Sequence, residues 1–124
     1  MPESDCEFFE IILDSLSSGI VAIDREGDVV VFNSTASRIL GVPKPEALGK
    51  KLLAIVPNAR LINVLRTGEP EVSLPDVIES RTVMTNRSPI FRNGKLAGAV
   101  ANFYDITEMN RISRELDSTK GLVR

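Results

Sequence analysis

The chain has 124 residues, of which 43% are hydrophobic, and its 15 Lys and Arg against 17 Asp and Glu give a net charge of -2. This length is typical of one domain, and the apolar fraction is sufficient for a core, which argues against disorder. The near balance of charge argues against a nucleic-acid-binding domain, and the absence of histidine excludes a Ser-His-Asp triad and histidine ligands for a metal or haem.

The cysteine content and the hydropathy pattern indicate the compartment. Cys6 is the single cysteine, so the chain forms no internal disulfide and no cysteine cluster for zinc, as expected in a reducing cytoplasm. No apolar run approaches the ~18 residues that span a bilayer. We therefore expect a cytoplasmic domain without membrane contact or metal. We also expect no enzymatic activity, because no nucleophile–base pair or carboxylate dyad stands out.

The first third of the chain predicts a helix followed by a hairpin. Residues 1–18 carry apolar side chains at helical spacing, namely Phe8, Phe9, Ile12, Leu13 and Leu16. Two β-branched runs at 19–24 and 29–33 flank a short turn that contains glycine, which is typical of a hairpin. Both runs are apolar at nearly every position, as in strands covered on both faces, and the chain offers only short helices for that purpose. We therefore expect a partner to cover one face.

Short helices are predicted between residues 34 and 68. Ser34 is placed to cap the first of them, and Pro45 suits the first turn of the second. Asn58 is placed to cap a helix over 59–67, which ends at Gly68.

The rest of the chain predicts strands and a final helix. A weak strand within 72–79 is interrupted by Pro75, and longer strands at 81–91 and 96–105 flank an Asn-Gly turn. Pro89 cannot donate to a ladder, so it predicts a bulge or an unpaired edge. Residues 107–124 show the 3-4 apolar spacing of a coiled-coil seam. Two heptads are too few to be stable alone, so we expect this helix to lead into a further domain. The element order predicts an α+β fold, with helices packed on an antiparallel sheet.

Four motifs in this order resemble a PAS domain, over roughly residues 7 to 120. They are Gly19-Ile20-Val21-Ala22-Ile23-Asp24 with Gly27; Phe32-Asn33 with Ala36, Leu40, Gly41 and Gly49; Ser88-Pro89-Ile90 with Gly94 and Gly98; and Asp105-Ile106-Thr107-Glu108. The sequences of these motifs are most similar to the sensory PAS modules of sigma-54-dependent transcriptional activators, and histidine kinases carry similar modules.

The resemblance implies a five-stranded antiparallel sheet of strand order 2-1-5-4-3, with short helices on one face and a pocket between them. It divides the chain into an N-terminal dimerisation helix (1–18), a PAS core (19–106) and a signalling helix (107–124) that leads to an effector such as an AAA+ ATPase. It implies a sensor of a small cytoplasmic molecule, in a homodimer that makes no direct contact with nucleic acid. Signal coupling is expected at Asp105, Thr107 and Glu108. The helix seam of the dimer is expected to comprise Phe8, Phe9, Ile12, Met109, Ile112 and Leu116.

The pocket residues are predicted from the implied fold and from polar positions on the last strands. The candidates are Ile39, Leu40, Leu53, Ile55, Val56, Leu61, Leu65, Arg87, Asn102 and Tyr104. For Arg87 the solvent face of the sheet is the favoured position, and the alternative is a pocket position where it pairs a ligand carboxylate. Alternation puts Asn102 and Tyr104 on one face and Ala99, Ala101 and Phe103 on the other, but it leaves open which face is concave.

Three alternatives to a small-molecule sensor of transcription remain open from the sequence. The apolar pocket residues also suit a filled core, and hence a dimerisation module without a ligand. The sensor domain of a histidine kinase is the second alternative. The third is a non-covalent flavin. No cofactor is predicted otherwise, because Asn33 is followed by Ser34-Thr35 rather than by the cysteine segment that light-sensing flavin PAS domains use.

Overall fold

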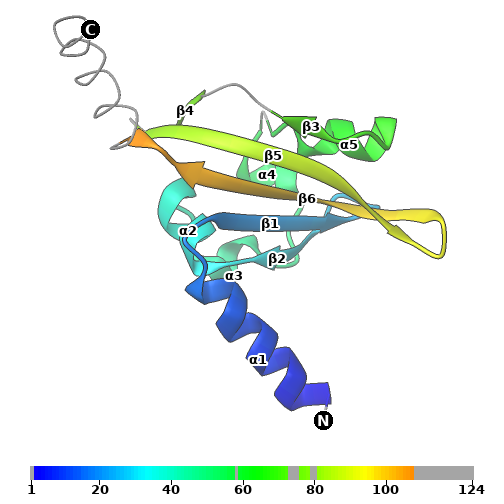
Figure 1. Cartoon of the computed structure of the whole chain (residues 1–124), viewed down its shortest axis with the longest axis horizontal. Coiled ribbons are helices and arrows are strands. Elements are labelled where there is room, and N and C mark those ends of the chain that lie inside the picture. The colour runs from blue at the N-terminus through cyan, green and yellow to red at the C-terminus, as the bar shows by residue number, and fades with distance from the viewer. Residues whose placement is uncertain (1, 58, 73–75, 79–80, 108–124) are drawn as a thin grey trace, which may run out of the picture.

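An antiparallel sheet organises the computed structural model, which describes residues 2–57, 59–72, 76–78 and 81–107. Its strands are β1 (Gly19–Asp24), β2 (Val29–Phe32), β3 (Glu71–Val72), β4 (Asp76–Ile78), β5 (Arg81–Arg92) and β6 (Lys95–Asp105). They lie in the order β2-β1-β6-β5-β3, and β4 also pairs with β5 (Figure 1). This arrangement confirms the expected order 2-1-5-4-3, with the weak third strand divided into β3 and β4.

The helices divide into a group that covers the sheet and one that leaves it. Four short helices follow β2 in the chain, α2 (Ser34–Leu40), α3 (Lys44–Ala47), α4 (Leu52–Ile55) and α5 (Leu61–Thr67). They lie on one face, which we call the inner face, whereas α1 (Pro2–Ser15) projects away from the sheet (Figure 1). The elements therefore form two layers with one helix outside them.

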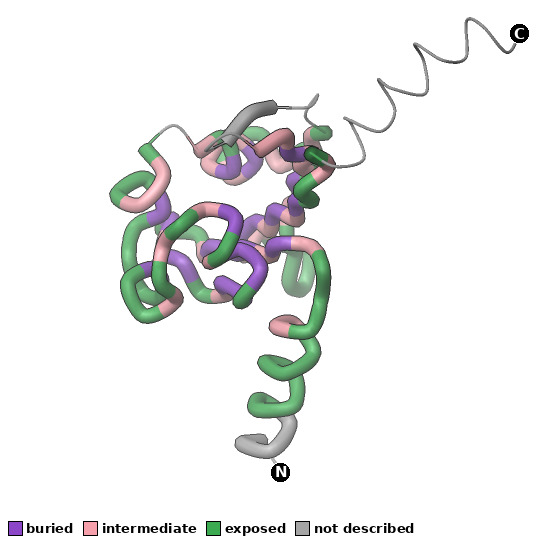
Figure 2. The backbone as a smooth tube through the Cα atoms, turned by 90° about the vertical axis from the view of Figure 1, so that its left-hand side faces the viewer, coloured by how far each residue is buried: buried purple, intermediate pink, exposed green. Residues whose placement is uncertain are grey.

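The core lies between the inner face and the short helices. The largest fully buried side chains include Phe32, Ile23, Val29, Val64 and Val83. Figure 2 shows this buried interior beside the mostly exposed α1. Burying each large aliphatic or aromatic side chain contributes about 1.5–3 kcal/mol, so the core, rather than α1, stabilises the domain.

The β5–β6 hairpin follows the turn chemistry of its sequence. Asn93 and Gly94 both adopt positive φ, at 52° and 79°, as a two-residue hairpin turn requires. The pairing register shifts between Ile90 and Phe91, one residue after Pro89. Pro89 itself pairs with Ala99, so the irregularity lies beside this proline and not at it, where a bulge or an unpaired edge was expected.

Two helix starts differ from the expected ones. Asn33 is the N-cap of α2, and its side-chain oxygen accepts from the Ala36 N–H at 2.9 Å. Ser34 is already helical, so its predicted capping role is wrong. Helix α5 begins at Leu61, after an Arg60 that forms no side-chain cap. Asn58 lies outside the described residues.

Most of the expected signalling helix also lies outside the described residues, with Glu108, Met109, Ile112 and Leu116. In the part of the chain that the structure describes, no helix combines the length and apolar character needed to cross a membrane.

Candidate functional site

A mostly apolar cavity of about 110 Å³ lies between the inner face of the sheet and the short helices. Strands β1, β5 and β6 form one wall, α4, α5 and the segment between them form the other, and the last residue of α2 closes one side. The lining residues are Val21, Leu40, Leu52, Val56, Ala59, Arg60, Leu61, Thr85, Arg87, Ala101 and Phe103. We call this space the inner cavity.

Four of the predicted pocket residues line the inner cavity, namely Leu40, Val56, Leu61 and Arg87. Ile39 belongs to the buried core, and Ile55 and Leu65 pack against it without lining the cavity. Leu53 is 46% exposed, because it lies on the outer side of the single-turn helix α4. The aliphatic residues of α4 and α5 therefore divide between cavity, core and surface.

Arg87 is buried in the cavity wall and does not lie on a solvent face. It pairs with Ala101 of β6 and with Glu71 of β3, so its side chain lies on the inner face. It is 7% exposed, and its Nε–H donates to Glu71 Oε1 at 3.2 Å. A guanidinium cannot lose its charge in a protein, so burial at this position requires an anionic partner.

Asn102 and Tyr104 lie on the other face of the sheet, which we call the outer face, and they do not line the inner cavity. The pairing register explains this position. Asn102 pairs with Asn86, the residue before Arg87, and successive side chains of a strand point to opposite faces. Asn102 lies beside a hollow of about 480 Å³ on the outer face, and its Oδ1 is buried without a hydrogen-bond partner among the described residues.

Sequence reasoning did not select four sheet residues that line the inner cavity: Val21, Thr85, Ala101 and Phe103. Alternation does place Ala101 and Phe103 on one face of β6. Because Arg87 pairs with Ala101, the β5–β6 register shows that this face is the inner one. Phe103 also contacts the neighbouring strand, since a Cβ added at Gly19 would lie 2.4 Å from its ring.

The end of β6 is fixed to the start of β5 by a set of hydrogen bonds. The Ile106 N–H donates to the Thr82 carbonyl oxygen, and the Thr82 N–H donates to Thr107 Oγ1, both at 2.8 Å. The Thr107 N–H donates to Asp105 Oδ1 at 2.9 Å. Hydrogen bonds from the Thr107 side chain and backbone lower the pKa of Asp105, and Arg81 adds a favourable charge. We call Asp105–Thr107 the exit junction.

A second set of hydrogen bonds joins the end of α1 to the start of α2. Besides capping α2, the Asn33 side chain accepts from the Ile20 N–H and donates to the carbonyl oxygens of Leu13 and Ser18. The Thr35 hydroxyl donates to the Leu16 carbonyl oxygen at 2.7 Å. We call this set the α1–α2 latch, because it determines the direction in which α1 leaves the core.

Asp14 adds an ionic contact to the latch. It accepts from the Ser34 N–H at 2.8 Å and pairs with the Lys44 ammonium at 3.2 Å. Burial raises the pKa of Asp14, but these hydrogen bonds and the Lys44 charge outweigh it, so that the pKa falls below its ordinary value.

The N-terminal seam residues are exposed on α1. Phe8, Phe9 and Ile12 are 62%, 63% and 38% exposed, on a helix that projects away from the sheet (Figure 2). As for metals, the described residues contain no group of three His, Cys, Asp or Glu side chains able to hold one.

Comparisons with known proteins agree with the fold. The family model described as PAS fold matches residues 7–106. Two curated relatives come from Halalkalibacterium halodurans. The sensor protein CitS is 33% identical over 113 residues, which cover 90% of this chain and 21% of CitS. A probable C4-dicarboxylate sensor kinase is 32% identical over 110 residues, covering 89% of this chain and 20% of the kinase.

A transcriptional activator and two solved structures extend these matches. The transcriptional activator RocR of Bacillus subtilis is 28% identical over 134 residues, covering 94% of this chain and 28% of RocR. The PAS domain of Bordetella pertussis BvgS superposes with a TM-score of 0.66 at 23% identity, over 95% of this chain and 98% of that one. Histidine kinase ThkA, in complex with the response regulator TrrA, superposes with a TM-score of 0.71 at 24% identity, over 90% of this chain and 35% of that one. The chain spans between 20% and 28% of the length of these curated relatives.

Proposed function

The chain belongs to the PAS family, and we propose that it senses a small cytoplasmic molecule in the inner cavity and passes the signal through the exit junction to an effector. The proposal assigns the domain no catalytic activity, no cofactor and no contact with nucleic acid or membrane. Its effector is that of a transcriptional regulator, of the sigma-54-dependent kind that the motifs resemble. The match to the transcriptional activator RocR supports this choice.

The position of β6 carries the proposal. Ala101 and Phe103 of this strand line the inner cavity, and Asp105 follows two residues later at the exit junction. A molecule that displaced Phe103 would therefore strain the hydrogen bonds of Thr107 with Thr82 and Asp105. Because packed elements shift between discrete arrangements, a small displacement of β6 changes the direction of the chain that follows.

The experiment combines native mass spectrometry with a variant that fills the cavity. Ala101→Ile places a larger side chain in the cavity wall, whereas the control Val100→Ile makes an addition of one methylene on the neighbouring, outer-face position of the same strand. We expect the chain purified from cells to retain an added mass that Ala101→Ile loses and Val100→Ile keeps. A chain without added mass, in a parent protein whose regulation is unaffected by Ala101→Ile, would contradict the proposal.

A histidine kinase is the second candidate for the effector, and the identities of 33% and 32% to two sensor proteins favour it. In either parent protein, the double substitution Asp105→Ala and Thr107→Ala removes the exit junction. We expect the loss of ligand-dependent transcription in an activator and of ligand-dependent autophosphorylation in a kinase. The readout that is lost, transcription or autophosphorylation, identifies the effector. If neither readout changes, the coupling role of the exit junction is refuted.

Dimerisation is a separate part of the proposal. The exposed apolar side chains of α1 support a homodimer in which this helix pairs with a second copy, since contiguous apolar exposure of this kind marks interaction surfaces. A dimerisation module without a ligand is the competing function. It predicts a dimer of unmodified mass in the same native mass spectrum.

A further inference from the structure

Arg87 supplies a buried positive charge to the inner cavity. Its side chain is 8% exposed, whereas that of its partner Glu71 is 34% exposed. Glu71 belongs to β3, which has two residues and pairs with β5 at one edge of the sheet. The Glu71 carboxylate thus lies on a short edge element, and Arg87 lies on the central part of a twelve-residue strand.

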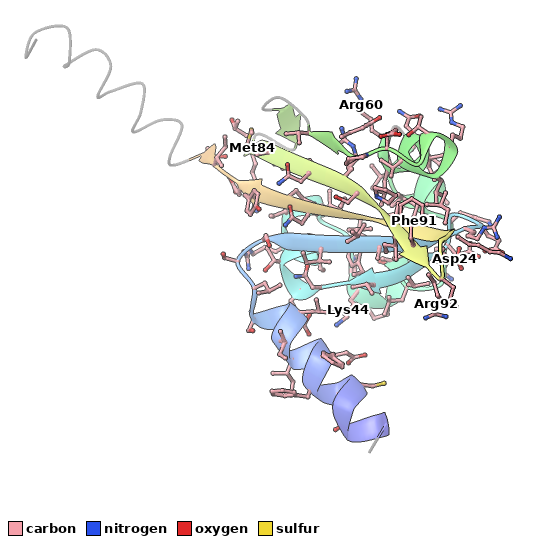
Figure 3. All side chains as sticks on the ribbon, turned by 45° about the vertical axis from the view of Figure 1, so that its right-hand side comes forward. Asp24, Lys44, Arg60, Met84, Phe91 and Arg92 are labelled. Atoms are coloured by element: carbon pink, nitrogen blue, oxygen red, sulfur yellow. The ribbon has the colours of Figure 1, made fainter. Side chains whose placement is uncertain are left out.

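The rest of the cavity lining is largely apolar. Among the described residues that line it, no side chain is acidic, and the remaining polar ones are Thr85 and Arg60. Arg60 is exposed, and its side chain extends outward from the edge of the domain (Figure 3). A molecule in the inner cavity therefore meets aliphatic and aromatic surface on most sides and a guanidinium on one.

The volume determines how much of this molecule the pocket covers. An enclosed cavity of ~150 Å³ lined by Leu, Ile and Phe accepts benzene, and the inner cavity measures about 110 Å³ and is open to solvent on one side. It therefore covers roughly four or five apolar carbon atoms of a ligand.

We propose that the ligand is a small organic carboxylate with a short apolar body, and that its carboxylate competes with Glu71 for Arg87. This inference rests on the proposed sensory function and names the ligand class of the same cavity. A guanidinium offers five N–H donors in a fork that matches a carboxylate. The ligand can therefore replace the Glu71 contact without leaving a buried charge unpaired, and the exchange releases Glu71 together with the two-residue strand β3.

The test is calorimetric titration of the 124-residue chain with sodium isovalerate and with isovaleramide, its neutral counterpart of nearly equal shape. We expect isovalerate to bind at least tenfold more tightly than the amide. Arg87→Gln is expected to abolish that preference, and Glu71→Gln to tighten isovalerate binding several-fold, because the internal competitor loses its charge. Arg66→Gln is the matched control, since Arg66 is exposed on α5 and contacts Asn63 rather than the cavity. It is expected to leave both affinities unchanged.

Each remaining outcome overturns all or part of the inference. Equal binding of acid and amide refutes a charged ligand and leaves the sensory cavity intact, whereas binding of neither probe refutes the class altogether. Tighter binding of succinate than of isovalerate refutes the apolar body. Should Arg87→Gln fail to fold, the acid–amide comparison on the unaltered chain and the Glu71→Gln titration still decide the question. The retained mass and the Ala101→Ile variant test the sensory function separately.

Discussion

The side-chain amide of Asn33 donates to the carbonyl oxygen of Leu13 at 2.7 Å, across twenty residues of sequence. The same buried side chain caps α2 through Ala36 and also bonds to the main chain at Ile20 and Ser18. One asparagine thus connects the end of α1, the start of β1 and the start of α2. Because α2 ends at Leu40 in the cavity lining, the direction of α1 is tied to an element that contacts the proposed ligand.

The substitution Asn33→Asp tests the α1–α2 latch. The introduced carboxylate keeps both acceptor contacts but presents an oxygen to the carbonyls of Leu13 and Ser18, which leaves them unsatisfied. For a side chain that is 1% exposed, we expect the free energy of unfolding to fall by roughly 2–4 kcal/mol. Urea denaturation measures the loss. Asn63→Asp, at a half-buried amide of α5, is the control, and an equal loss in both variants would contradict the latch.

The close approach of β6 to β1 depends on Gly98. A Cβ added there would lie 2.2 Å from the Ile23 carbonyl oxygen, a backbone atom that cannot move aside without disturbing the sheet. We expect Gly98→Ala to destabilise the fold by about 3 kcal/mol. Gly68→Ala is the control, because its Cβ meets open space and only its φ of 69° is unfavourable, which costs about 1 kcal/mol. Thermal denaturation that ranks the two variants in the opposite order would exclude a steric role for Gly98.

Local sequence signals predicted the strands closely. The Asn93-Gly94 pair fixed the β5–β6 hairpin, and the β-branched runs placed β1 and β2 within about a residue of their observed bounds. These signals succeed because turn geometry and strand preference depend on neighbouring residues. The capping bond of Asn33 with Ala36 is local, and it was missed because the neighbouring Ser34 is an equally favoured capping residue. The contacts of Asn33 with Leu13 and Ser18 join segments that are remote in sequence, so no local signal predicts them.

The cavity was only partly predictable for a related reason. Alternation divides each strand into two faces, but the pairing register decides which faces coincide, and a shift by one residue reverses them. Arg87 pairs with Ala101, whereas Asn86 pairs with Asn102, so the two pocket candidates Arg87 and Asn102 lie on opposite faces of the sheet. Whether the aliphatic residues fill or enclose space depends on the placement of α4 and α5, which hydrophobicity alone does not determine.

The oligomeric state tests the role of α1. We expect the chain to sediment as a dimer at high micromolar concentration, and Phe9→Asp with Ile12→Asp to sediment as a monomer, because charges on this face prevent apolar contact between two copies. Cys6→Ser, an exposed position on the same helix, is expected to leave the dimer intact. Circular dichroism establishes that the double variant remains folded. A monomeric parent chain would show that the exposed face serves another purpose.

The stability of the exit junction depends on pH through Asp105. Hydrogen bonds from Thr107 lower its pKa in the folded state. Its contribution to the free energy of unfolding is therefore complete above the ordinary carboxyl pKa, near 3.8. The contribution is lost as the pH falls through the lower pKa of the folded state. We expect Asp105→Ala to cost about 1 kcal/mol at pH 7, at the low end for hydrogen bonds to an ionised group, because the side chain is 33% exposed. Denaturation at pH 7, 5 and 3 should show a constant difference from the parent chain at the two higher values and a smaller one at pH 3. Glu46→Gln, at an exposed position, controls for the removal of one acid, and a difference that grows toward low pH would contradict the hydrogen-bonded carboxylate.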